Sequence, residues 1–383
     1  MLIGRPISVI GGGIGGLAVA LACAQRGAQV TVLEQAEAIA EVGAGIQISP
    51  NGWVVLEALG VAGALADRSM RSTAVRLRDF RRGAEVFTMA LRGDFYLVHR
   101  ADLIEVLRAA CVAAGVTIRL GVQVTEVTPD GRANRLTLAD GSSETHGLTL
   151  AADGLNSAAR RALNAKSRAF FTGQVAWRAT LPGRDLPAEA HVFMGPGRHL
   201  VRYPLRGGAL TNIVAVEERD EWAAEGWHHA DDPENLRVAF TDFCPEIREM
   251  LDDVQAPKLW GLYRHPVARH WHAEALALLG DAAHPTLPFL AQGANLALED
   301  AYVLSRILAD EPDTATALAR YQAARKTRTA RVIEAANDNA TNYHLRPGPL
   351  RFAAHSALRI ASRVAPHVVA NRYRWIHSHD VTR

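Results

Sequence analysis

The chain has 383 residues, of which 49% are hydrophobic and 21% are charged, and its formal net charge is +2 at pH 7. This length allows two domains with a sizeable core, and the balanced charge does not indicate a nucleic-acid partner. Cys23, Cys111 and Cys244 are widely spaced, so we expect no disulfide framework, no metal site and a reducing, cytoplasmic setting. We also expect neither a membrane span nor an export leader.

The first 35 residues predict a strand, a glycine-rich turn, a helix and a second strand. The apolar run at 7–10 is typical of a buried strand, and residues 17–26 and 29–33 give the helix and the next strand. The turn has the pattern G-x-G-x-x-G, which allows a tight turn, close approach of a pyrophosphate and close helix packing. Glu34 stands where a carboxylate accepts hydrogen bonds from a ribose. The pattern predicts a dinucleotide site formed by Gly11, Gly13, Ile14, Gly15, Gly16, Glu34 and Gln35.

Two later segments repeat the order of strand, turn and helix. In LTLAADGLNSAARRAL at 148–163, an apolar strand runs into Asp153–Gly154. In LALLGDAAHPTLPFLAQGANLALEDAYVLSRIL at 276–308, a strand ends at Gly280–Asp281 and a long helix begins near Asn295. Each alone is compatible with an ordinary connection, because Asp is a common turn or cap residue. The three segments in this order are far more specific.

Together these segments resemble the three fingerprints of the FAD-dependent aromatic hydroxylases, which are single-component flavoprotein monooxygenases. The sequence is most similar to the group of salicylate hydroxylase, 3-hydroxybenzoate 6-hydroxylase and 6-hydroxynicotinate monooxygenase. GAGIQISPNG at 43–52, HRADL at 99–103 and RYRWIHSHD at 372–380 also match that group. The resemblance therefore covers essentially the whole chain.

The resemblance implies an α/β fold with a discontinuous, Rossmann-like FAD-binding domain at 1–72, 97–166 and 273–345. A β-sheet substrate domain is expected at 73–96 and 167–272. There the sequence itself predicts a hairpin, several short strands and a helix at 236–251. The segment 346–383 is expected to be a helical tail that packs on the FAD domain.

The resemblance also implies how nucleotides bind. A second G-x-G-x-x-G unit is missing, so we expect one bound FAD and a transient visit by NADH or NADPH. Asp281 is expected at the ribityl chain, and backbone N–H groups of Gln292 to Asn295 at the flavin O2/N1 end. Further expected FAD contacts are Ala44, Gly45, Arg100, Val124, Asp153, Gly154, Gly280, Pro288, Gly293 and Ala294.

The implied reaction is the hydroxylation of an electron-rich ring through a flavin C4a-hydroperoxide, for which a base that ionises a phenol makes the ring more nucleophilic. A strand through GRHLVRYPL places His199 and Tyr203 on one face. The resemblance implies His199 as the base, with Tyr203 and Gln292 as further catalytic residues. A strand histidine bonded within the sheet is the alternative. We expect His284 to have a structural or flavin-side role and His99 to be structural.

Two residues differ from those of the 6-hydroxynicotinate enzymes, and the differences bear on the kind of substrate. Phe289 and Gln47 stand where 6-hydroxynicotinate enzymes have histidines, which favours a benzoate-type or other phenolic substrate. Arg178 or Arg202 is a candidate partner for a substrate carboxylate, with a structural role as an equal alternative.

We expect the partners to be a small aromatic substrate, O2 and NAD(P)H, in a monomer or homodimer. A reductase or antibiotic-modifying oxygenase on the same scaffold remains open, as does a flavin-binding regulatory protein without turnover. A halogenase is disfavoured, because no W-x-W-x-I-P segment is present.

Overall fold

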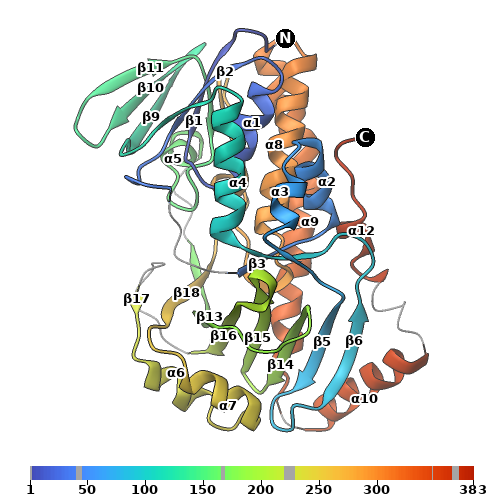
Figure 1. The fold of residues 1–383 in the computed structure, drawn as a ribbon. Helices are drawn as coiled ribbons and strands as arrows, with labels where there is room; N and C mark the ends of the chain where they lie inside the picture. Colours follow the sequence, from blue (N-terminus) through green and yellow to red (C-terminus); the bar gives the residue numbers. More distant parts are fainter. Residues whose placement is uncertain (1, 40–44, 165–168, 220–228, 347, 365–370) are drawn as a thin grey trace.

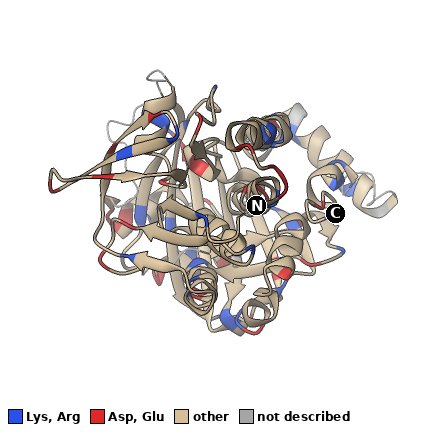
Figure 2. Cartoon of the chain, turned by 90° about the horizontal axis from the view of Figure 1, so that it is seen from above, with Lys and Arg blue, Asp and Glu red and all other residues tan. Residues whose placement is uncertain are grey.

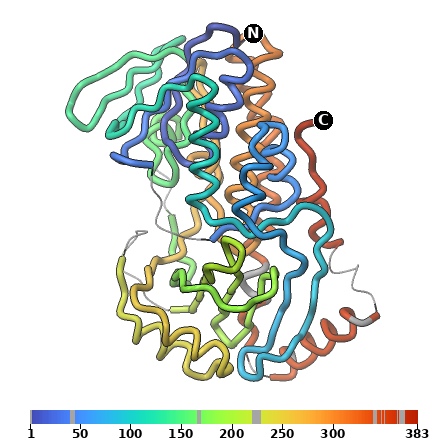
Figure 3. The backbone as a smooth tube through the Cα atoms, viewed as in Figure 1, coloured from blue at the N-terminus to red at the C-terminus, as the bar shows by residue number. Residues whose placement is uncertain are grey.

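The computed structural model describes residues 2–39, 45–164, 169–219, 229–346, 348–364 and 371–383. Two large β-sheets stand one above the other, each with helices packed on it (Figure 1). Segments from the start, the middle and the last third of the chain interleave in the upper part, whereas one middle segment forms most of the lower part (Figure 3). The mixed α/β class expected from the sequence is confirmed.

The upper sheet is parallel and has the strand order β19-β12-β1-β2-β8. Its strands are β1 (Pro6–Ile10), β2 (Gln29–Leu33), β8 (Thr117–Arg119), β12 (Leu148–Ala151) and β19 (Leu276–Leu278). Strands β12 and β19 are buried along their whole length, which is typical of a parallel sheet that is covered on both faces. Helix α1 (Ile14–Ala24) packs against α4 (Arg100–Ala113) and α8 (Gly293–Asp310) beside this sheet.

Shorter elements complete the upper part. The helices are α2 (Pro50–Ala58), α3 (Ala62–Ala66), α5 (Ala158–Leu163) and the long α9 (Thr314–Tyr343). One small sheet joins β3 (Gly45–Ile48), β4 (Met70–Arg71) and β7 (Tyr96–His99). Another joins β9 (Val124–Asp130), β10 (Ala133–Leu138) and β11 (Ser143–His146).

The lower sheet has eight strands in the order β17-β18-β13-β16-β15-β14-β5-β6. They are β5 (Ala74–Asp79), β6 (Glu85–Ala90), β13 (Phe170–Pro182), β14 (Glu189–Gly195), β15 (Arg198–Leu205), β16 (Leu210–Glu218), β17 (His229–Ala230) and β18 (Lys258–Arg264). Only β5 and β14 pair in parallel among these described strands. The expected hairpin is present as β5 and β6.

The two faces of the lower sheet have different neighbours. One face packs on α6 (Pro233–Ala239) and α7 (Pro245–Asp252) through a core that includes Trp177 and Leu200. The other face carries Val216 and Trp260, which pack with Phe289 from the loop before α8. The expected single helix at 236–251 is wrong in detail, because Pro245 lacks an N–H group and starts a second helix.

The tail expected on the FAD domain contacts both parts of the molecule. Helix α10 (Pro349–Val364) packs against β6 of the lower sheet, and α12 (Arg374–His377) contacts α2. Within the described ranges, none of the helices has the length and apolar character needed to cross a membrane. Along the ribbon in Figure 2, the positions of Lys and Arg are interspersed with those of Asp and Glu.

The glycine-rich turn after β1 depends on missing side chains. Gly11 has φ +99°, and a Cβ there would lie 2.5 Å from the carbonyl oxygen of Ala152. A Cβ at Gly16 would lie 1.9 Å from the carbonyl oxygen of Gly11. The first and last glycines of the motif therefore let the chain turn tightly and let α1 begin directly beside the strands.

This geometry predicts that Gly16→Ala destabilises the protein by about 1–3 kcal/mol, the usual cost of overpacking a tight contact. Gly63→Ala in α3 is the matched control, because a Cβ there has no neighbour within 4 Å and alanine favours a helix over glycine by about 0.5–1 kcal/mol. Denaturant unfolding of the two variants at equal FAD concentration makes the comparison. Equal unfolding midpoints would contradict the proposed contact.

Candidate active site

The three sequence motifs meet at one edge of the upper sheet. Strands β12 and β19 are neighbours, and β12 also pairs with β1. Because the three strands are parallel, the loops that follow them leave the sheet at the same end. These loops carry Gly11 to Gly16, Asp153–Gly154 and Gly280–Asp281. The carboxyl edge of a parallel sheet is where ligands bind in α/β folds.

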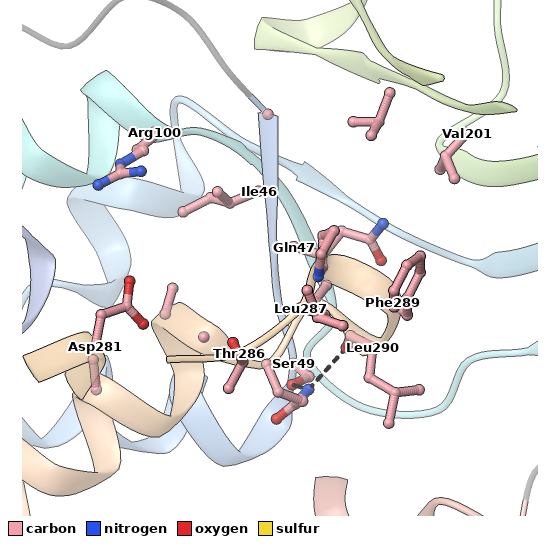
Figure 4. Close-up of a pocket in the computed structure, with 18 of the residues that line it drawn as sticks. Ile46, Gln47, Ser49, Arg100, Val201, Asp281, Thr286, Leu287, Phe289 and Leu290 are labelled. Carbon is pink, nitrogen blue, oxygen red and sulfur yellow. Dashed lines mark hydrogen bonds between the residues drawn. The ribbon is translucent and has the colours of Figure 1, made fainter. Parts of the chain in front are cut away.

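A cavity of about 440 Å³ lies between these loops and the lower sheet. Figure 4 shows Arg100 and Asp281 at one end of it and Val201 and Phe289 at the other. Of the residues predicted from the sequence, the cavity is lined by Gly13, Ile14, Gly15, Gly45, Arg100, Gly154, His199, Tyr203, Gly280, Asp281, Pro288, Gln292, Gly293 and Ala294.

Other predicted residues lie away from the cavity lining. Gly11 and Gly16 shape the turn, and Gln35 is exposed beyond β2. Val124 is partly buried at the start of β9. Glu34, Asp153 and Asn295 also lie outside the cavity lining, and their contacts are described below. Ala44 is outside the described residues.

The glycine-rich end of the cavity fits a dinucleotide. Gly13 is the N-cap of α1, so the free N–H groups of this helix open on the cavity. A Cβ at Gly13 would meet no protein atom within 4 Å, which leaves room for a phosphate. Glu34 accepts hydrogen bonds from the backbone N–H groups of Gly12 at 2.5 Å and Ala36 at 2.9 Å. Its carboxylate thus holds the turn in place from the end of β2.

Asp281 is the acidic group of the cavity wall. Its accessible surface opens on the cavity, and within the described chain no hydrogen bond reaches its carboxylate. Asp281 is exposed on the cavity side, but desolvation by the protein around the cavity still raises its pKa, while the nearby His284, Arg100 and His265 oppose that shift. A carboxylate with unused acceptor positions in this place fits the hydroxyl groups of a bound cofactor.

The other aspartate expected near the cofactor has a structural contact. Asp153 accepts a hydrogen bond from the backbone N–H of Ala158 at 2.8 Å, so it caps the start of α5. Burial raises the pKa of this carboxyl. Asp153 therefore holds the turn whose next residue, Gly154, lines the cavity.

The loop before α8 is fixed by a buried amide network. Ala291 adopts a left-handed conformation with φ +52°, and α8 begins at Gly293. The Gln292 side chain donates to Ser49 Oγ at 3.0 Å and accepts from Asn51 at 3.1 Å. The Gln292 amide is thus held by Asn51 of α2 and by Ser49, the N-cap residue of that helix.

The Asn295 side chain is also used within the protein. It accepts from the Ser49 backbone N–H at 3.0 Å and donates to the Gln47 and Ala291 carbonyl groups. A Cβ at Gly52 would lie 2.2 Å from Asn295 Oδ1, so glycine is required there. The sequence motif did not reveal this second role of the segment at 47–52.

Strand β15 divides its side chains between the two faces of the lower sheet. His199, Val201 and Tyr203 line the cavity. Leu200 belongs to the core under α6 and α7, and Arg202 forms an ion pair with Glu246 of α7. The expectation that His199 and Tyr203 share a face therefore agrees with the geometry. Arg202 points the other way, which removes it as a partner for a ligand in the cavity.

His199 is buried and makes a contact that sequence reasoning missed. Its side chain is 2% exposed, and its Nδ1 lies 2.6 Å from Nε2 of His344. His344 Nδ1 in turn lies 2.8 Å from a carboxylate oxygen of Glu218. Burial, together with His344, holds the pKa of His199 well below its usual range. His344 lies directly after α9, so only the fold brings it to β15.

Tyr203 is a neutral group of the cavity wall. Burial raises the pKa of its phenol above the usual range. Its ring packs on the backbone of β3, where a Cβ at Gly45 would lie 2.6 Å from Tyr203 Cε2. Tyr203 is thus positioned to donate or accept a hydrogen bond and is a poor candidate for a base.

An arginine of β13 lines the cavity, whereas two histidines named in the sequence motifs lie elsewhere. Arg178 lines the cavity with its guanidinium 4.5 Å from the centre of the Trp260 ring. His284 contacts Asp300 Oδ2 at 2.5 Å in a buried cluster behind the cavity. His99 lies at the end of β7 with its Nδ1 3.5 Å from Arg206. Both histidines therefore have structural contacts, in line with the expectation.

The described residues contain no group of three or more His, Cys, Asp or Glu side chains that could hold a metal ion.

Comparisons with known proteins give the family. A model described as an FAD binding domain matches residues 5–336. A 3-amino-4-hydroxybenzoate 2-monooxygenase from Streptomyces platensis is 34% identical, over 98% of this chain and 96% of the relative. A 3-hydroxybenzoate 6-hydroxylase from Klebsiella oxytoca is 33% identical, over 88% of each chain. A solved structure of Klebsiella pneumoniae HpxO with FAD and uric acid has a TM-score of 0.83 at 25% identity, covering 94% of each chain.

These matches confirm the resemblance inferred from the three motifs. They extend from the glycine-rich turn to the long helix α9, so they include both walls of the cavity. The chain belongs to the family of FAD-binding flavoprotein monooxygenases that includes hydroxybenzoate hydroxylases.

Proposed function

We propose that this protein hydroxylates a small phenolic acid of the hydroxybenzoate type, with NAD(P)H and O2 as co-substrates. The observation that carries the proposal is the position of His199 on the cavity wall of the lower sheet. Its ring lies 5.9 Å from Phe289 in the loop before α8, which is the loop expected beside the flavin. Relatives named for 3-amino-4-hydroxybenzoate and 3-hydroxybenzoate support this substrate class.

The residues of this chain have separate tasks in the proposal. His199 takes the phenol proton, which makes the ring electron-rich. Tyr203 hydrogen-bonds as a neutral phenol, and the apolar residues Val201, Val216 and Phe289 keep water from the ring. FAD supplies the redox chemistry with O2 when it is bound. In the overall reaction one oxygen atom enters the ring and the other leaves as water, while NAD(P)H is oxidised.

The substrate carboxylate is assigned to Arg178 in this proposal. Arg178 lines the cavity from β13, next to Trp260, whereas Arg202 is engaged by Glu246 on the opposite face. A guanidinium binds a carboxylate through two parallel hydrogen bonds. The presence of Arg178 in the cavity wall therefore favours an aromatic acid over an uncharged phenol as the substrate.

The test is a panel of phenols and hydroxybenzoates, offered to the FAD-loaded protein with NADH and with NADPH. A hydroxylase shows faster NAD(P)H oxidation with its ligand and a product one oxygen atom heavier. Oxidation of NAD(P)H without an oxygenated product would favour a reductase. A yellow protein that neither accepts hydride nor consumes O2 would favour a regulatory flavoprotein.

We predict that Asp281→Asn weakens FAD binding while it stabilises the apo protein at neutral pH. The raised pKa means that folding disfavours the charged carboxylate, so the apo protein loses stability as pH rises from the unfolded-state pKa of about 4 through the higher folded-state pKa. Asparagine removes that charge and replaces one of the two acceptor oxygens offered to the cofactor with an NH2 donor. FAD titration and thermal unfolding of the apo protein between pH 4 and 8 measure both effects.

Asp67→Asn, at an exposed position after α3, is the control and should change neither quantity. Unchanged FAD affinity in Asp281→Asn would contradict the assignment of this residue to the cofactor site.

We predict that His199→Ala retains FAD but slows hydroxylation by about 10²–10⁴-fold, the usual contribution of a positioned acid–base group. More NAD(P)H should be consumed per product formed, because a neutral phenol reacts slowly. Raising the pH should restore part of the rate, since solvent then ionises the phenol. Product formed per NAD(P)H consumed between pH 6 and 10 measures these effects.

His191→Ala is the matched control, because His191 is a buried histidine that points to the opposite face of the same sheet, where it contacts Glu189 and Arg202. Wild-type coupling and an unchanged pH profile in His199→Ala would assign the base to another group.

A further inference from the structure

The contact between His199 and His344 continues to the surface of the molecule. His199 and His344 are 2% and 5% exposed, whereas the side chain of Glu218 is 43% exposed. The distances along the chain of contacts are 2.6 Å and 2.8 Å. A buried cavity residue is thus joined to solvent through two hydrogen bonds.

The carboxylate determines which nitrogen of each ring carries a proton. An ionised Glu218 can only accept, so His344 must donate from Nδ1. A neutral His344 then has a bare Nε2, which accepts from Nδ1–H of His199. A neutral His199 consequently has a bare Nε2, and no side chain of the described chain hydrogen-bonds to that nitrogen. This is the form in which His199 can accept a proton from a ligand in the cavity.

The groups around His199 and His344 are compatible with this arrangement of protons on the two rings. Gln174 Nε2 lies 3.5 Å from His344 Nδ1, at the limit of a hydrogen bond, so the shorter contact with Glu218 decides. The ring centre of Tyr343 lies 5.2 Å from that of His199, and burial keeps this phenol neutral by raising its pKa. Burial lowers the pKa of both histidines, which keeps them uncharged at rest.

We propose that His344 and Glu218 are positioning residues that set His199 as the base and conduct the phenol proton to solvent. The proposal rests on the function proposed above. The phenol O–H bond breaks and the proton binds His199 Nε2. The proton on His199 Nδ1 passes to His344 Nε2, and the one on His344 Nδ1 passes to Glu218 and then to water. The same transfers in reverse return a proton to the phenolate oxygen as product leaves, which restores the starting form.

The relay also explains how a strongly buried histidine can act as a base. A proton left on His199 would place a positive charge in an apolar cavity. Transfer to His344 moves that charge next to a carboxylate, where it is stabilised. Glu218 thus makes His199 a stronger base through His344, although Glu218 and His199 are not in contact.

The first test measures the protonated ring nitrogens of His199 and His344 by 15N NMR in the FAD-loaded protein without ligand. Spectra of His199→Gln and His344→Gln assign the signals. We expect a bare Nε2 on both rings. Glu218→Gln should shift both rings toward a mixture of forms, because an amide can also donate. Glu217→Gln on the same strand, where Glu217 pairs with Arg219, should leave the spectrum unchanged. A protonated His199 Nε2 in the wild type would overturn the proposal.

The second test follows proton release when 4-hydroxy-3-nitrobenzoate binds at a pH low enough for the free ligand to be a neutral phenol, with its phenolate absorbance and a pH indicator as readouts. We expect His344→Gln and Glu218→Gln to slow release by about 10- to 100-fold. The loss should be smaller than the roughly 10⁴-fold effect of a fully buried carboxylate that orients a histidine, because Glu218 is partly exposed. Glu217→Gln should behave as wild type.

The outcomes separate the two proposals. Slow release in both variants, with ligand affinity retained, supports the relay. Wild-type release in these variants, but not in His199→Gln, would overturn the relay and leave the base assignment intact. Wild-type release in His199→Gln, or no release from the wild type, would overturn both.

Discussion

The close approach of parallel strands at one edge of the upper sheet is the constraint on which the rest of the structure depends. Strand β1 pairs with β12, which pairs with β19, and all three run in the same direction. Three loops from distant parts of the sequence therefore meet at one place. The contact of Gly11 with Ala152 lets the first two loops lie side by side, since any side chain at Gly11 would collide with that carbonyl group. The close contact between Gly11 and Ala152 therefore allows the loops to form one wall of the cavity.

The lower sheet completes the cavity through the alternation of its strands. On β15, Leu200 anchors the strand to the core under α6 and α7, which fixes the direction of His199 and Tyr203 on the opposite face. Alternate residues of one strand thus pack into the core and line the cavity. The loop before α8 then covers the cavity, and its own amide network with Ser49 and Asn51 holds it in position.

Local patterns predicted much of this arrangement. The G-x-G-x-x-G turn and the strands around it depend on nearby residues, and the alternation in GRHLVRYPL placed His199 and Tyr203 correctly on one face. Contacts between distant residues escaped prediction. His344 is 145 residues from His199 and 126 from Glu218, and no local pattern links them. Asn295 and Arg202 show the same limit, since their internal partners Ser49 and Glu246 come from other elements.

The central claim is that this chain inserts one atom of O2 into an aromatic ring held beside His199. Turnover of the ligand under 18O2 in ordinary water, followed by mass spectrometry of the product, tests that claim most directly. We expect one 18O atom in the new ring hydroxyl group and none when the label is supplied as H2 18O. An unlabelled product under 18O2, or a hydroxyl group labelled from water, would contradict it.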